Sequence, residues 1–310
     1  MDPARHPVAG VTIPLVTVLD AHGDPDVDAA RPLLRHLADG GVTTLMLAGT
    51  NGEGPALSAE AVRSYAAGVS TVWRQMVGTG ARVTATAPGA GTAETVARIG
   101  ALADLGLDAV VVLAPFYFRH TAAELRAHFR EAAGCGVPVV IYNSPGYTGN
   151  PVTAALVRDL LDEPGIVGIK DSSGDPALFA ELCAATRPGF LVAQGAEKQL
   201  AAGLRAGAAG LVPGVGMLAP GLCVELFRRA TAGDHAGAEA LQRGVDRLTA
   251  IFGVRPGVSG VAVVKAALHL LGLCPPHATR PFAPLTGVEV AALHETLAEV
   301  LPQMSSPSAR

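Results

Sequence analysis

The chain contains two short apolar runs, residues 137–142 (VPVVIY) and residues 166–169 (IVGI), with a helix-like segment between them. In that segment Leu156, Leu160 and Leu161 share one face, as in an amphipathic helix. Both runs are apolar at consecutive positions, which is typical of parallel strands covered by helices. The stretch therefore predicts a strand, a helix and a second strand of a parallel α/β fold.

The same pattern recurs along the rest of the chain. Six further apolar runs precede segments with helical spacing, at residues 11–16, 43–47, 83–87, 109–113, 190–193 and 209–212. Eight alternations of strand and helix favour a closed (β/α)8 TIM barrel, since a doubly wound sheet usually ends at roughly five to seven strands. A doubly wound sheet remains the alternative. Thr121 with Glu124 predicts a capping box, and Ser58 and Thr153 are expected N-caps.

After Val212 the pattern becomes purely helical, near residues 222–232, 236–252, 261–271 and 288–301. The expected organisation is a catalytic barrel over residues 1–225, a C-terminal helical bundle over 226–302 and a flexible tail over 303–310. One barrel with a helical extension accounts for all 310 residues.

Composition limits the classes of function. Hydrophobic residues make up 49% of the chain and charged residues 16%, enough for a large core. The net charge of −4 and the lack of a long basic run exclude nucleic acid or a membrane as the main partner, and favour a small molecule. The four cysteines have no C-x-x-C spacing, and no apolar signal core or membrane-spanning stretch is present. A soluble, cytoplasmic protein is expected.

Lys170 follows the run at 166–169, where a barrel strand would reach its carboxyl end. Active sites of such barrels lie at that end, and a poorly solvated amine there favours the neutral, nucleophilic form that attacks a carbonyl. The chain has only three lysines. Lys198 resembles a solvated helix start, and Lys265, on a late helix, is expected to pack or to form an ion pair. Lys170 is therefore the candidate for imine formation.

Two further strand ends carry candidate residues. Tyr142 precedes Lys170 by 170 − 142 = 28 residues, about one β/α unit, so the two side chains should lie side by side at the barrel mouth. A phenol there could transfer protons. Residues 49–55 (GTNGEGP) follow the second run, and glycines with amides near a helix start can hold a carboxylate or phosphate. The nine histidines form no H-x-x-x-H or H-E-x-x-H pair, so no metal site is indicated.

In order, residues 49–53 (GTNGE), Tyr142-Asn143-x-Pro145 and residues 168–171 (GIKD) resemble the dihydrodipicolinate synthase and N-acetylneuraminate lyase family. The resemblance runs over nearly the whole chain. It implies a barrel with a C-terminal helical bundle, a homo-oligomer (dimer or tetramer), and no metal or organic cofactor. It also implies that a 2-oxo acid such as pyruvate binds covalently, with an aldehyde as the second small molecule.

The resemblance also implies roles for individual residues. Lys170 would form the Schiff base, and Tyr142 would be the acid/base group. Thr50 and Asn51, after Gly49, would hold the substrate carboxylate, with Thr50 also relaying protons.

Two further site residues follow from the same resemblance. Tyr117 would reach into a neighbouring subunit's site to complete a Tyr-Thr-Tyr relay. Val212 would place its backbone carbonyl near the lysine.

One departure concerns Tyr147. Dihydrodipicolinate synthases usually carry an arginine there for the second substrate's carboxylate, and a tyrosine cannot replace a charged bidentate donor. The chain is therefore expected to be nearer the 4-hydroxy-2-oxoglutarate and 2-keto-3-deoxy sugar acid aldolases, cleaving a carbon–carbon bond reversibly. The alternatives are condensation as in dihydrodipicolinate synthase, dehydration of a sugar acid through the same imine, or a non-catalytic barrel that binds a 2-oxo acid.

Overall fold

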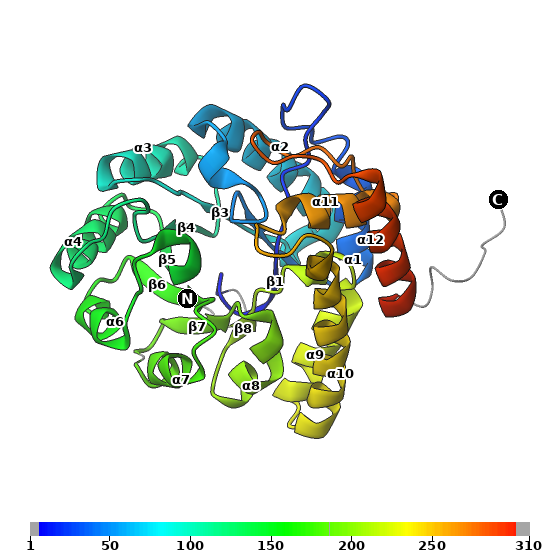
Figure 1. The fold of residues 1–310 in the computed structure, drawn as a ribbon. Helices are drawn as coiled ribbons and strands as arrows, with labels where there is room; N and C mark the ends of the chain where they lie inside the picture. Colours follow the sequence, from blue (N-terminus) through cyan, green and yellow to red (C-terminus); the bar gives the residue numbers. More distant parts are fainter. Residues whose placement is uncertain (1–5, 186, 302–310) are drawn as a thin grey trace.

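Eight parallel strands close into a barrel in chain order in a computed structural model that describes residues 6–185 and 187–301 (Figure 1). The strands are β1 (Gly10–Pro14), β2 (Thr44–Leu47), β3 (Arg82–Thr86), β4 (Ala109–Leu113), β5 (Val139–Asn143), β6 (Ile166–Asp171), β7 (Leu191–Gln194) and β8 (Gly210–Leu211). Each coincides with a predicted run to within a few residues, so the TIM barrel is confirmed and the doubly wound alternative is wrong. The tail expected at 303–310 lies outside the described residues.

Helices surround the strands and gather on one side as a C-terminal extension (Figure 1). The α-helices are α1 (Arg31–Asp39), α2 (Ala59–Val77), α3 (Thr92–Leu102), α4 (Ala122–Ala133), α5 (Pro145–Thr148), α6 (Ala154–Leu160), α7 (Pro176–Ala184), α8 (Leu200–Arg205), α9 (Pro220–Thr231), α10 (His235–Leu248), α11 (Val261–Leu270) and α12 (Gly287–Val300). The short 3-10 turns are η2 (Gly54–Ala56), η3 (Gly78–Gly80), η4 (Glu197–Gln199), η5 (Val215–Met217) and η6 (Thr249–Val254).

The predicted helix starts are confirmed. Ser58 and Thr153 each accept a hydrogen bond from a backbone N–H in the first turn of the following helix. Thr121 and Glu124 form the capping box at the start of α4. Each such cap contributes about 1 kcal/mol by satisfying amides that the helix itself leaves free.

Two apolar layers stabilise the barrel. In β5, Val139 and Ile141 pack outward into a cluster that also contains helix residues, whereas Val140 and Tyr142 belong to a smaller cluster without any helix residue. Because successive side chains of a strand point to opposite faces, the smaller cluster is the barrel interior. Tyr142 therefore points into the barrel.

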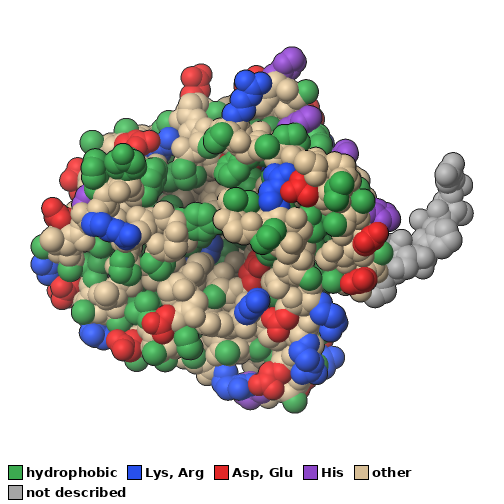
Figure 2. Space-filling view, in the orientation of Figure 1, with side chains coloured by type: hydrophobic (Ala, Val, Ile, Leu, Met, Phe, Trp, Pro, Cys, Tyr) green, Lys and Arg blue, Asp and Glu red, His purple; other side chains and the backbone are tan. Residues whose placement is uncertain are grey.

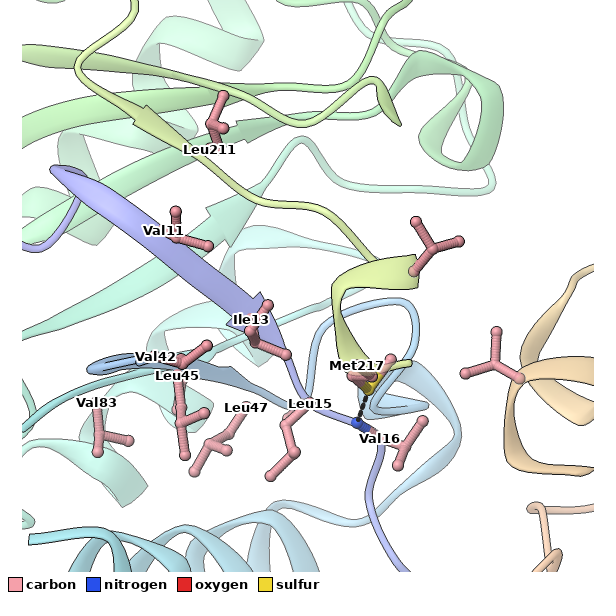
Figure 3. Packing of buried hydrophobic residues seen from close by; sticks show 14 of the residues in the cluster. Val11, Ile13, Leu15, Val16, Val42, Leu45, Leu47, Val83, Leu211 and Met217 are labelled. Carbon is pink, nitrogen blue, oxygen red and sulfur yellow. Dashed lines mark hydrogen bonds between the residues drawn. The ribbon is translucent and has the colours of Figure 1, made fainter. Parts of the chain in front are cut away.

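The barrel closes where β8 meets β1, over only two residue pairs. Gly210 is required there, because a Cβ atom at this position would lie 1.9 Å from the carbonyl oxygen of Val8. Beyond the end of β1, the amide of Val16 donates to the sulfur of Met217 in η5 at 3.4 Å, and Ile13 packs alongside (Figure 3). Burying a side chain of the size of Ile13 or Met217 contributes roughly 1.5–3 kcal/mol to stability.

The C-terminal extension begins where the barrel ends. Helix α9 packs against α8 and β1 and also against α10, so it joins the barrel to the extension. The division expected between residues 225 and 226 falls inside this continuous helix. Among the described residues, no helix is both long enough and apolar enough to cross a membrane.

Candidate active site

A cavity of about 580 Å³ lies at the carboxyl ends of the strands. The end of β6, the residues after β2, β5, β7 and β8, and the 249–260 stretch of the C-terminal extension all contribute lining residues. Figure 2 shows a hollow over the barrel, with charged side chains of both signs around it. Parallel strands bring their carboxyl ends to one face, so residues far apart in sequence meet here.

Lys170 and Tyr142 lie side by side in this cavity, as predicted. They are register partners in the β5–β6 pair, and the Lys170 Nζ lies 3.9 Å from the centroid of the Tyr142 ring. Both side chains are nearly inaccessible, with 5% and 4% of their surface exposed. Burial against an aromatic face leaves the amine little water to solvate its charge. Among the described residues no carboxylate forms an ion pair with Lys170.

Asn143 and Asp171, the next residues that face each other in β5 and β6, join the same two strand ends. The Asn143 Nδ2 donates to the Asp171 Oδ1 at 2.6 Å, and the Ser173 hydroxyl donates to the other carboxylate oxygen at 2.8 Å. Burial raises the pKa of Asp171, and these hydrogen bonds oppose the shift. Such a buried polar network resists deformation because every broken bond leaves a desolvated group. It therefore holds Tyr142 and Lys170 in register.

Thr50 completes a short polar chain with Tyr142. The Thr50 Oγ1 lies 3.4 Å from the Tyr142 hydroxyl. Burial alone would raise the pKa of Tyr142, but the charge of Lys170 and hydrogen bonds from Thr50, Ser144 and Lys170 outweigh it, so the pKa lies below its ordinary value. A phenol with a lowered pKa gives up and recovers its proton more readily. The arrangement can move a proton between the cavity and Thr50.

Six of the predicted site residues share this cavity: Thr50, Asn51, Tyr142, Tyr147, Lys170 and Val212. Gly49, the first residue of the loop at residues 49–53, is buried and does not line the cavity.

Tyr117 does not line it either. It is 86% exposed, has a left-handed backbone (φ 84°) and stacks edge-on against Phe118. Within its own chain Tyr117 thus stands apart from Lys170.

Several lining residues escaped the sequence analysis. Ser144 and Ser172 directly follow β5 and β6, and Glu197, Lys198 and Gln199 follow β7. The interpretation of Lys198 as a solvated helix start is incomplete, because this exposed side chain also borders the cavity. Their signal in the sequence is a polar residue shortly after an apolar run.

Glu197 brings a carboxylate to the cavity. Its Oε1 accepts a hydrogen bond from the Val215 amide at 2.7 Å. Burial raises the pKa of Glu197, and the amides of Val215 and Gly214 and the charge of Lys170 oppose that shift. Across the described part of the chain, no group of three or more His, Cys, Asp or Glu side chains is arranged to hold a metal ion.

The sequence profile of the Dihydrodipicolinate synthetase family matches residues 7–300. The chain belongs to this family. Family members are lyases and synthases that act on small molecules, so the chain is an enzyme of the carbon–carbon lyase type.

Individual relatives match over nearly their full length. A 4-hydroxy-tetrahydrodipicolinate synthase of Corynebacterium aurimucosum is 32% identical over 288 residues, covering 93% of each chain. A DapA-like lyase of Halobacterium salinarum is 34% identical, covering 94% of this chain and 93% of the relative. Among solved structures, the E. coli prophage protein YagE, a member of the same family determined in complex with pyruvate, superposes with a TM-score of 0.87 at 28% identity, covering 94% of this chain and 98% of YagE.

Proposed function

We propose that this enzyme forms a Schiff base between Lys170 and pyruvate or a related 2-oxo acid and reversibly cleaves a carbon–carbon bond. The observation that carries the proposal is the amine of Lys170, 3.9 Å above the Tyr142 ring in a cavity that also contains Thr50. The pyruvate bound to YagE supports the choice of ligand.

The proposed reaction begins when the neutral amine attacks the ketone carbon of a 4-hydroxy-2-oxo acid. Tyr142 donates a proton to the departing hydroxyl, so that water leaves, Tyr142 becomes a phenolate and a protonated imine forms, which can accept electrons. Tyr142 takes the proton of the C4 hydroxyl, the C3–C4 bond breaks, and its electron pair forms an enamine while an aldehyde leaves. Protonation of the enamine at C3 and hydrolysis of the imine release pyruvate and free Lys170. The imine is the electron sink, so this sequence needs neither a metal nor an organic cofactor.

The remaining residues have supporting roles in this proposal. Thr50 and Asn51 hold the substrate carboxylate, and Thr50 passes protons to and from Tyr142. Val212 borders the same cavity, and its backbone carbonyl helps to orient the lysine. Tyr117, exposed in its own chain, enters a neighbouring subunit's site in a homodimer or homotetramer. Its exposed fraction of 86% supports a role that needs a partner surface.

Substrate choice depends on the residues beyond the imine. Tyr147 borders the cavity where a charged arginine would bind a second carboxylate, which favours cleavage of a 4-hydroxy-2-oxo acid or a 2-keto-3-deoxy sugar acid. The second candidate is condensation as in 4-hydroxy-tetrahydrodipicolinate synthase, because curated relatives carry that name. Dehydration of a sugar acid would use the same imine.

Borohydride reduction tests the imine. Incubation with pyruvate and borohydride should add the mass of a reduced pyruvate adduct to Lys170, located by peptide mass spectrometry. Lys198 offers the internal control, because it borders the same cavity yet is exposed. An unmodified Lys170, or equal labelling of both lysines, would refute the proposal.

Product analysis separates the reaction types. Pyruvate supplied with a panel of aldehydes should give 4-hydroxy-2-oxo acids if the enzyme is an aldolase. Turnover only with aspartate semialdehyde would favour the synthase, and water loss from a sugar acid without aldehyde release would favour the dehydratase.

A further inference from the structure

A fully buried ion pair joins the active-site loop to the C-terminal extension. Glu53 ends the loop at residues 49–53, which carries Thr50 and Asn51, and Lys265 lies on α11. The Lys265 Nζ and the Glu53 Oε1 form a salt bridge in which neither side chain has any exposed surface. Isolating two charges from water is costly unless their contacts are complete.

The contacts of this pair are nearly complete. The second oxygen of Glu53, Oε2, accepts from the amide of Thr279 at 2.6 Å and from its hydroxyl at 2.8 Å. The Lys265 ammonium donates to the carbonyl oxygen of His277 at 2.6 Å. Lys265 on α11 thus contacts one carboxylate oxygen of Glu53 and Thr279 the other, and no described residue of the barrel strands forms a hydrogen bond or ion pair with either.

The loop held in this way is tightly folded. Glu53 has a left-handed backbone (φ 57°), which is strained for a residue with a side chain. Its amide donates to the carbonyl oxygen of Thr50 at 3.1 Å, and the amide of Gly54 donates to that of Gly49 at 3.2 Å. A Cβ atom at Gly54 would lie 1.9 Å from the carbonyl oxygen of Ala48, so only glycine fits. A displacement of the Glu53 carboxylate would therefore be transmitted to Thr50.

We propose that Glu53 and Lys265 are a positioning pair, through which the C-terminal extension holds Thr50 and Asn51 facing the cavity. The inference rests on the proposed function, in which Thr50 and Asn51 bind the substrate carboxylate. Stability alone does not account for the pair, because well-packed apolar side chains often replace a buried ion pair without loss of stability. Apolar replacements would not hold the loop at residues 49–53 in one orientation, because they form no directional bonds.

The double variant Glu53→Leu with Lys265→Met tests the inference without leaving an unpaired buried charge. In the full-length protein, borohydride trapping is measured against pyruvate concentration. The concentration giving half-maximal labelling of Lys170 should rise roughly ten- to hundredfold, because a misplaced binding group weakens carboxylate recognition. Labelling at saturating pyruvate should persist, because Lys170 is untouched.

A matched control and a second readout separate positioning from a general loss of structure. Arg130 and Glu163 form an ion pair between α4 and the segment before β6, with no contact to the loop, so Arg130→Met with Glu163→Gln should leave half-maximal labelling unchanged. In the Glu53→Leu, Lys265→Met variant the tyrosinate titration of Tyr142 should move upward, since Thr50 no longer stabilises the phenolate.

Thr279→Val is the milder variant if the double variant does not fold. It removes one donor to Glu53 and keeps the ion pair, so half-maximal labelling should rise a few-fold, in the same direction. Unchanged labelling in every folded variant overturns the positioning role and leaves the proposed function intact. Absence of labelling in the unaltered enzyme overturns the proposed function, and the positioning role with it.

Discussion

Lys170 and Lys265 are both buried lysines on apolar segments, yet their surroundings give them opposite roles. Lys170, 5% exposed, faces an aromatic ring and a cavity, and no described carboxylate pairs with it. Lys265 is fully buried, and Glu53 and the carbonyl of His277 surround its ammonium. Burial lowers the pKa of Lys265, and Glu53 opposes that shift. Burial by itself therefore does not distinguish the lysine that we propose to be reactive; Lys170 differs from Lys265 in facing an open cavity and in having no ion pair with a described carboxylate.

The largest expected effect is on activity, from removal of the Lys170 amine. Lys170→Met should lower kcat/KM on the order of 10⁴-fold or more, because Lys198, the other lysine that borders the cavity, is exposed and does not share the buried position over the Tyr142 ring. Its thermal midpoint should stay within a few degrees of the unaltered enzyme, because no ion pair with a described residue is broken. Steady-state kinetics measure the loss of kcat/KM, and thermal unfolding measures the midpoint. Substantial remaining turnover would contradict the imine mechanism.

Removal of the second lysine should have its main effect on stability. Lys265→Met leaves the Glu53 carboxylate buried without its cation, which should lower the free energy of unfolding by about 3–5 kcal/mol. The measurement is chemical unfolding at fixed protein concentration. The double variant with Glu53→Leu is the control and should recover most of the loss. Equal destabilisation in both variants would show that packing volume, not the unpaired charge, is responsible.

The phenol beside Lys170 should matter next most. Tyr142→Phe keeps the ring under the amine and removes the hydroxyl, so kcat should fall about 10²- to 10³-fold, in the range of acid-base groups. Borohydride labelling of Lys170 should continue, though more slowly. Labelling and turnover compared on the same preparation distinguish proton transfer from imine formation. An equal loss of labelling and of turnover would assign Tyr142 to imine formation instead.

The smallest effect is a shift in titration. Lys170 is a positive charge that favours the phenolate of Tyr142, so the pKa of Tyr142 lies below 10 in the unaltered enzyme and should rise in Lys170→Met. Ultraviolet absorbance of tyrosinate against pH follows the change. The Tyr142→Phe variant identifies which transition belongs to Tyr142 among the four tyrosines. Burial raises the pKa of Tyr65, so its transition does not overlap with that of Tyr142. An unchanged pKa of Tyr142 would contradict stabilisation of its phenolate by Lys170.

The same comparison shows how much could be read from sequence. The closeness of Lys170 and Tyr142 was predictable, because successive parallel strands place residues about one β/α unit apart at the same height. That Lys265 packs or pairs was also predictable, from its apolar helix. Its partner was not, because Glu53 lies in a distant loop and nothing local relates the two positions.

The cavity wall shows the same limit. Glu197 and Lys198 could have been found at the end of β7 by the rule that found Lys170. Phe252 and Val258, contributed by the extension, could not, because nothing in their local sequence indicates which barrel face they cover.

The sequence by itself determined the strands, the helix caps and the lysine at the strand end, since each depends on periodicity and on bonding between near neighbours. Only the tertiary structure decided which charges meet in the interior and which residues enclose the cavity. Those outcomes depend on how the C-terminal helices pack against the barrel, and packing is a property of whole surfaces that no short stretch of residues specifies.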